Sequence, residues 1–251
     1  MANWSDPRIS GSQPAATTAG RAEVAFDAGL RSHMLSVYNY MTSGVLLTGM
    51  VALGAALMGI PQQLFFGGSI LGWVVIFAPL IMVFFLMARV NHMSTAGMQV
   101  FFWTFATVMG LSMSIIPLIY NGQSIAMAFF ATAAAFASLS LYGYTTKRDL
   151  SGFGTFFLMG LVGLIVVMLL NWGIAWYTGL PNPVLDTVIS VFGVLIFAGL
   201  TVYDTQKIKS IYFQVAGTDF LGKAAILGAL NLYLDFINMF QFLLSLIGNR
   251  E

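Results

Sequence analysis

The stretch LNLYLDFINMFQFLL, residues 230–244, decides the fold, because it is apolar along nearly its whole length. It nevertheless contains an aspartate. Leu, Tyr, Phe, Ile and Met surround Asp235 on both sides. Asn231 stands four residues before it and Asn238 three residues after it, so on a helix all three share one face. A run of this length and hydrophobicity is typical of a membrane-spanning helix.

The whole chain has the composition of an integral membrane protein. Of its 251 residues, 59% are hydrophobic and 8% are charged, whereas a soluble domain carries about 25% charged residues. The mean hydropathy is +0.87. In lipid every backbone polar group needs an internal partner, and the apolar stretches are too long for barrel strands of about 9–11 alternating residues. We therefore predict an all-α membrane protein.

Seven apolar stretches follow one another, each near the roughly 20 residues that a spanning helix needs. They cover residues 38–60, 67–88, 98–120, 123–144, 153–177, 184–206 and 224–247. Residues 1–30 are rich in Ser, Ala, Thr, Gly and Pro, so we expect a flexible cytoplasmic N-terminal tail there. Residues 31–251 then form one seven-helix transmembrane domain.

The basic residues indicate how the bundle is oriented. Nine of the ten Lys and Arg side chains lie in the N-terminal tail or in alternate loops, and only Arg250 lies beyond the seventh stretch. Since cytoplasmic loops carry an excess of Lys and Arg, this alternation predicts seven spans with the N-terminus inside and the C-terminus outside.

Small residues predict how one helix packs. Ala131, Ala134, Ala135 and Ser138 recur at the spacing of one helical face in the fourth stretch. Small side chains let two membrane helices approach closely. We expect this face to contact another helix.

Asp186 sits at the outer mouth of the sixth predicted span, and two other carboxylates lie further along the spans: Asp204 near the inner end of the sixth, and Asp235 in the seventh. A charge at mid-membrane costs about 2.5–3.5 kcal/mol on insertion scales, so such residues are functional candidates by default. The alternative, that each aspartate only caps or bonds a neighbouring helix, stays open. Counted from the outer helix ends, their depths differ by about 7 Å at 1.5 Å per residue.

If these carboxylates meet, they are expected to act together. Two like charges in a medium of low dielectric constant tend to share one proton. Deprotonated, the pair could bind a hard divalent cation such as calcium through its oxygens. The Asn231 and Asn238 amides could donate to Asp235 or line a wet path. Arg89, at the inner end of the second span, could pair with Asp204 as a latch, or could serve only as a topology signal.

Other classes of function lack their residues. The chain has no cysteine, which excludes disulfides and thiolate metal sites. Its only histidines, His33 and His92, are expected at the inner surface, and no HExxH motif or nucleophile–base set is visible. We expect no enzyme and no cofactor other than a calcium ion. A net charge of +1 gives no bulk attraction to nucleic acid.

Three motifs resemble the Bax inhibitor-1 family, also called the transmembrane Bax inhibitor motif family, in its bacterial branch. They are YGYTTKRDLSGFG (142–154), YDTQKIK (203–209) and LYLDFINMFQFLL (232–244). The resemblance implies a multi-pass protein of the bacterial inner membrane, with the last helix central in the bundle. It also implies an aspartate-pair sensor, which maps to Asp204 and Asp235, and a latch arginine, which maps to Arg89.

Two functions follow from this resemblance together with the residues. The first is a pH-sensitive calcium or cation leak channel, gated by protonation of the aspartate pair. The second is a membrane interaction protein that binds and modulates a membrane-anchored protease. The N-terminal tail and the small-residue face would suit the second role.

Overall fold

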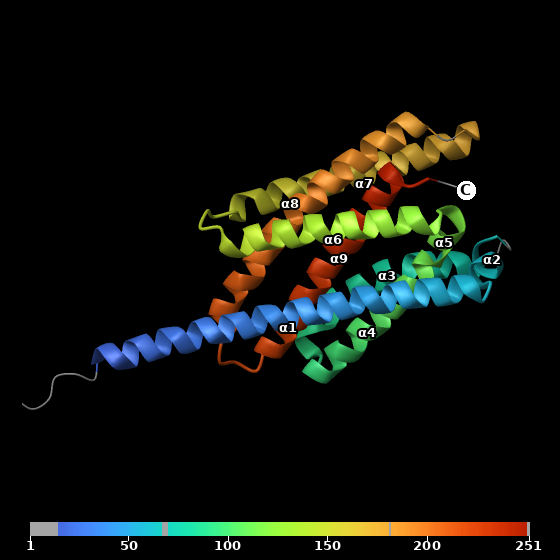
Figure 1. The fold of residues 1–251 in the computed structure, drawn as a ribbon. Coiled ribbons are helices and arrows are strands. Elements are labelled where there is room, and N and C mark those ends of the chain that lie inside the picture. The colour runs from blue at the N-terminus through green and yellow to red at the C-terminus, as the bar shows by residue number, and fades with distance from the viewer. Residues whose placement is uncertain (1–14, 67–69, 181, 250–251) are drawn as a thin grey trace, which may run out of the picture.

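The structure, a computed structural model, describes residues 15–66, 70–180 and 182–249. These ranges are helical and contain no strand. Seven of their helical segments are long and apolar enough to cross a membrane, which confirms the predicted all-α, seven-span fold class. They are built from α1 (Ala15–Leu57), α3 (Ile70–Arg89), α4 (Thr95–Ser112), α6 (Gly122–Thr145), α7 (Ser151–Thr178), α8 (Pro183–Val215) and α9 (Leu221–Ile247). The short helices α2 (Ile60–Phe65) and α5 (Ile116–Ile119) lie at one end of the bundle (Figure 1).

Local signals set the helix ends. Gly59 adopts a positive φ of 71° before α2, and Pro61 occupies the first turn of that helix, where its missing N–H costs nothing. Asn121 caps α6, its side chain accepting from the Ser124 backbone N–H at 2.8 Å. Gly179, with φ of 68°, ends α7 in a left-handed conformation that glycine adopts without steric cost.

Two helices are longer than the sequence predicts. Helix α1 begins at Ala15 and continues unbroken into the first span. The predicted tail falls partly on residues 1–14, outside the described residues, and the domain boundary at residue 30 stays a prediction. Helix α8 runs nine residues past the predicted end at Gln206. The buried residues Ile208 and Tyr212 follow a helical spacing there, while Lys207 is exposed on another face.

Helix α9 is central in the bundle, as predicted. It contacts α1, α4, α6 and α8, and Figure 1 shows it between α1 on one side and α6 and α8 on the other. Half of its most apolar segment is buried, against a third or less in each of the other six spans. We call the end where α7 and α9 finish the outer end, after the predicted orientation, which itself stays a prediction.

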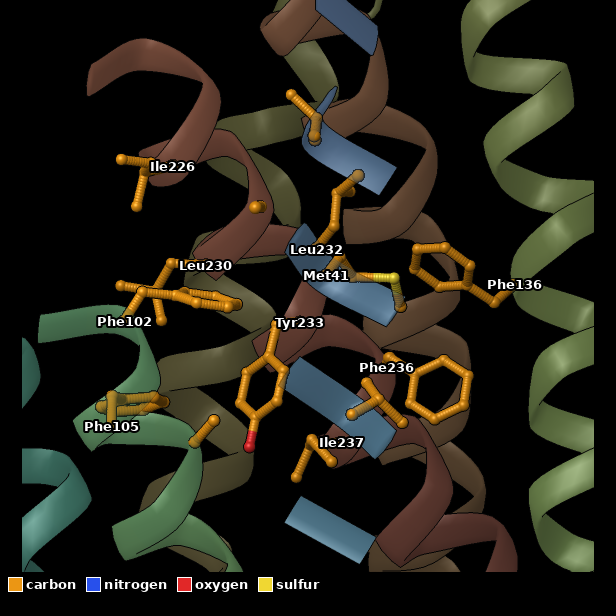
Figure 2. Packing of buried hydrophobic residues seen from close by; sticks show 14 of the residues in the cluster. Met41, Phe102, Phe105, Phe136, Ile226, Leu230, Leu232, Tyr233, Phe236 and Ile237 are labelled. Carbon is orange, nitrogen blue, oxygen red and sulfur yellow. The ribbon is translucent and has the colours of Figure 1, made fainter. Parts of the chain in front are cut away.

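Tyr233 anchors α9 to two neighbouring helices. Its fully buried ring packs edge-on against Phe102 and Phe105 of α4, at centroid distances of 6.1 and 5.8 Å (Figure 2). Its hydroxyl lies 2.6 Å from the Thr48 hydroxyl of α1. Thr48 in turn donates to the backbone oxygen of Ala106 at 2.9 Å. Because the single Thr48 proton is used there, Tyr233 donates to Thr48.

Helix α8 is held close to α6. A Cβ atom on Gly143 of α6 would lie 2.5 Å from the backbone oxygen of Val202, so only glycine permits this approach. Nearby, the Ser140 hydroxyl bonds the Thr205 hydroxyl at 3.0 Å and the Tyr38 hydroxyl at 2.6 Å. These contacts join α1, α6 and α8 next to Asp204.

The prediction that the small-residue face of the fourth span packs against another helix of the bundle is wrong. Ala131, Ala134 and Ser138 are exposed, and Ala135 is half-buried. The buried face of α6 instead repeats every three or four residues through Ser124, Ala128, Thr132, Phe136, Ser140 and Gly143. The hydroxyl bonds and the glycine contact toward α8 decide the rotation of this helix, so its alanine face points out of the bundle.

Candidate functional site

Asp204 and Asp235 lie on the two arms of the α8–α9 hairpin. Asp204 is eleven residues before the end of α8 at Val215, and Asp235 is fourteen residues after the start of α9 at Leu221. Measured from their shared turn, the two depths therefore differ by about 4–5 Å at the helical rise of 1.5 Å per residue. The two carboxylates are close enough to interact electrostatically.

The Asp235 carboxylate is buried without a compensating charge. Its side chain is 4% exposed, and its Oδ2 atom has no hydrogen-bond partner among the described residues. The charged group that acts on it is Asp204, which has the same sign. Burying an unpaired carboxylate is costly. A proton or a bound cation would relieve both the burial and the repulsion.

Asp204 is less enclosed than its neighbour. It is half-buried, and Lys207, one turn further along α8, exerts an attractive field on it. Lys207 also lies over the ring of Tyr203, with its Nζ atom 5.8 Å from the centroid. The pair therefore has a deep member, Asp235, and a shallower member that faces positive charge toward the inner end.

The asparagines beside Asp235 do not donate to it. The Asn238 Nδ2 atom donates to the backbone oxygen of Leu234 at 2.8 Å, within its own helix. Asn231 is exposed. Asn231, the half-buried Asn238 and the exposed Gln241 share a face of α9 that the other helices leave largely uncovered. This placement fits the second role expected of them, lining a wet path beside Asp235.

Arg89 ends α3 and is exposed there. Within the described residues, no ion pair joins Arg89 to Asp204. The latch assignment therefore stays a prediction.

The histidines divide into one buried and one exposed residue. His92 is exposed, whereas His33 is 5% exposed, with its ring centroid 5.4 Å from that of Tyr212. His33 packs near the inner end of α8, so its expected place at the inner side of the membrane stays a prediction, and the structure adds that its ring lies on a packed face. The signal was present in the sequence, since Leu30, Met34 and Val37 repeat around it at helical spacing.

Comparison with known proteins agrees with this architecture. Residues 30–251 match the family described as "Inhibitor of apoptosis-promoting Bax1". The inner membrane protein YbhL of Escherichia coli K12 is 42% identical over 226 residues, which cover 89% of this chain and 94% of that protein. An uncharacterised protein of Rickettsia prowazekii is also 42% identical, over 90% of this chain and 93% of its own length. An uncharacterised protein of Caulobacter vibrioides is 41% identical, over 93% and 95%.

The resemblance stated from three short motifs therefore extends over the whole bundle. Seven apolar helices, and a relative that is named an inner membrane protein, confirm the expected location in the bacterial inner membrane. The chain is a multi-pass membrane protein that belongs to the Bax inhibitor-1 family.

Proposed function

We propose that this protein is a cation leak channel for calcium, gated by protonation of the Asp204/Asp235 pair. One observation supports the proposal above all others. A buried carboxylate oxygen of Asp235 has no hydrogen-bond partner among the described residues, while a second carboxylate acts on it from the next helix. Intramembrane carboxylates of this kind mark ion or proton pathways.

Protons and cations compete for such a pair. With both carboxylates charged, their repulsion in a low-dielectric interior favours binding of a hard divalent cation through oxygen ligands. With a shared proton, the pair loses negative charge and holds the cation less well. Lys207 tunes this balance through its field on Asp204. Passive conduction of this kind needs no catalytic group and no cofactor.

The uncovered face of α9 supplies a route to the pair. Asn231, Asn238 and Gln241 place amide groups along that face, and amides can replace part of the hydration shell of a cation. A path lined in this way runs beside Asp235, and because that side chain is 4% exposed, a local opening of the packing around it completes the route to the carboxylate.

The test is calcium flux into vesicles that contain a calcium-sensitive dye and the purified protein. The wild type is expected to show a flux that depends on pH, and the double variant Asp204→Asn with Asp235→Asn to lose that dependence. Asp219→Asn is the matched control, because Asp219 is exposed in the turn between α8 and α9. A pH profile that the double variant leaves unchanged would falsify the gating mechanism.

A second candidate function is binding to a membrane-anchored protease. The observation in its favour is the exposed face of Ala131, Ala134 and Ser138 on α6, since smooth faces of small residues suit helix association in lipid. Under this alternative, Ala134→Leu would lose the protease from a co-purification while calcium flux stays unchanged. Retention of the protease by Ala134→Leu would remove this face from consideration.

A further inference from the structure

We propose that the groove between α1 and α6 binds an anionic phospholipid, with an acyl chain in the groove and the phosphate at Arg31. The groove is a cavity of about 660 Å³. Helices α1 and α6 both pack on α9, and Phe236 of α9 lies at the base of the groove between them. The exposed residues Leu46 of α1 and Ala137 of α6 belong to its walls, so the groove opens to the surface of the bundle.

The base of the groove is aromatic. Phe129 and Phe136 of α6 each pack edge-on against the Phe236 ring, at a centroid distance of 5.7 Å. Met41 of α1 lies beside them (Figure 2). A flexible hydrocarbon chain fits such a surface, because it buries apolar area and needs no hydrogen-bond partner.

The length of the groove suits one acyl chain. It follows α1 from Arg31 to Leu46, which are 15 residues apart, or about 22 Å at the helical rise. Half of the hydrocarbon core of a bilayer is about 15 Å thick. The groove can therefore hold a whole acyl chain while the headgroup stays at its inner end.

The inner end of the groove carries positive charge. Arg31 is exposed there and is the charged side chain among the described residues that line the groove. No ion pair with another described residue neutralises it. Lys209 adds a second charge, because its Nζ atom lies 5.2 Å from the ring centroid of Tyr144, which also lines the groove. Basic pockets between membrane helices on the cytoplasmic side bind anionic lipid headgroups.

The hydroxyl groups at the base of the groove are already satisfied by the protein. Thr205 donates to the backbone oxygen of Thr201 at 2.7 Å. Because each hydroxyl has one proton, Ser140 donates to Thr205 and Tyr38 donates to Ser140. Tyr38 and Ser140 line the groove, so their bonds leave no free proton that a polar ligand would be needed to accept. This favours an apolar occupant below the charged end.

A helix of a partner protein is too wide for the groove. A helix about 10 Å in diameter and 22 Å long occupies about 1,700 Å³, more than twice the 660 Å³ of the groove. Cavities that bind small molecules measure about 300–1,000 Å³ and are mostly apolar with a few polar groups. The size and the lining therefore favour a lipid over a helix.

Native mass spectrometry of the purified full chain tests the headgroup site. The chain is titrated in detergent with dioleoyl phosphatidylglycerol or with dioleoyl phosphatidylethanolamine, which have the same acyl chains and differ in net charge. The wild type should bind phosphatidylglycerol more tightly. Arg31→Gln should weaken that binding about fivefold, the contribution of one basic residue at an anionic surface, and leave phosphatidylethanolamine unchanged. Arg89→Gln is the matched control, because Arg89 is exposed at the end of α3 and lies outside the groove.

A pair of alanine variants tests the acyl-chain site. Ala137→Trp places a large side chain in the groove and should lose the first bound lipid whatever its headgroup. Ala134→Trp is the matched control, because Ala134 is also exposed on α6 but does not line the groove, and it should retain the lipid. Circular dichroism checks that both variants are folded. Inorganic phosphate at millimolar concentration should not displace phosphatidylglycerol, because it has no acyl chain.

Four results would overturn the site. They are equal affinity of the wild type for the two lipids, an equal loss of affinity in Arg31→Gln and Arg89→Gln, displacement of the lipid by phosphate, and retention of the lipid by a folded Ala137→Trp. If Ala137→Trp instead converts a dimer to a monomer without changing lipid binding, the groove belongs to a second copy of the chain. No flux is measured, so the outcome is independent of the proposed channel.

Discussion

The two partners of the hydrogen bond between Thr48 and Tyr233 should differ in how much stability is lost when each is substituted. Thr48→Val removes the acceptor of the Tyr233 hydroxyl and the donor to the Ala106 backbone oxygen. Tyr233→Phe removes one donor and leaves the bond from Thr48 to Ala106 intact. The two changes nearly conserve side-chain shape, so the aromatic packing of Tyr233 on α4 is retained. The bond lies two residues from Asp235, and it therefore helps to fix the position of that carboxylate.

The magnitudes follow from which groups lose their partners. Hydrogen bonds between membrane helices average about 0.6 kcal/mol, and we expect Tyr233→Phe to cost about that much. A buried hydroxyl without an acceptor costs about 1–3 kcal/mol, and Thr48→Val should fall in that range. In the double variant no hydroxyl is stranded. It should be no less stable than Thr48→Val alone, which corresponds to a coupling of at least about 0.6 kcal/mol.

Reversible unfolding of the purified protein in mixed micelles, titrated with a denaturing detergent, measures these free energies. The order expected is wild type, then Tyr233→Phe, then Thr48→Val, with the double variant at or above Thr48→Val. A double variant whose loss of stability equals the sum of the two single losses would refute the assigned donor and acceptor. So would a Tyr233→Phe variant that is less stable than Thr48→Val.

Two other predictions concern a close helix contact and a loop carboxylate. Gly143→Ala should destabilise the fold by about 1–3 kcal/mol through overpacking against Val202. Gly163→Ala is the control, because a Cβ there would meet nothing within 4 Å, and it should be neutral or slightly stabilising. Thermal unfolding of both variants in detergent measures the difference. The backbone N–H of Ser151 donates to Asp149 and lowers the pKa of that carboxyl below its ordinary 3.8. The stabilisation is therefore fully present above pH 3.8 and is lost as pH falls through the lowered folded-state pKa. Asp149→Asn should reduce stability at neutral pH, and the difference from the wild type should vanish in strong acid; an equal difference at both would contradict the assigned cause.

The number of spans and the position of Asp235 inside the seventh span could be predicted from the sequence, because both depend on where long apolar segments lie. The central position of α9 was implied by the family resemblance. Helix ends were harder to predict. Lys207 marks a loop if charge alone is read, yet buried Ile208 and Tyr212 show that the helix continues past it. The charge lies on one face of a helix that extends beyond its apolar segment.

The directions in which side chains point were also hard to predict from the sequence. Asn238 has a polar neighbour in Asp235 by spacing, but a carbonyl of its own helix is nearer and accepts its amide hydrogen. The alanines of α6 fit a packing face equally well by spacing, and the position of α8 decides against them. The partner of Asn171 could not be predicted from the sequence, because a single amide inside an apolar span does not indicate which group it bonds. In the structure its Nδ2 atom donates to Asp186 of the next helix.

The measurement that tests the central claim most directly is infrared difference spectroscopy of the purified protein, with and without calcium. If protons and calcium compete for the Asp204/Asp235 pair, calcium should reduce a protonated-carboxyl band, and that band should be missing from Asp235→Asn. The band should also titrate over the same pH interval as the calcium flux. A protonated-carboxyl band that persists in Asp235→Asn, or that calcium leaves unchanged, would contradict the account.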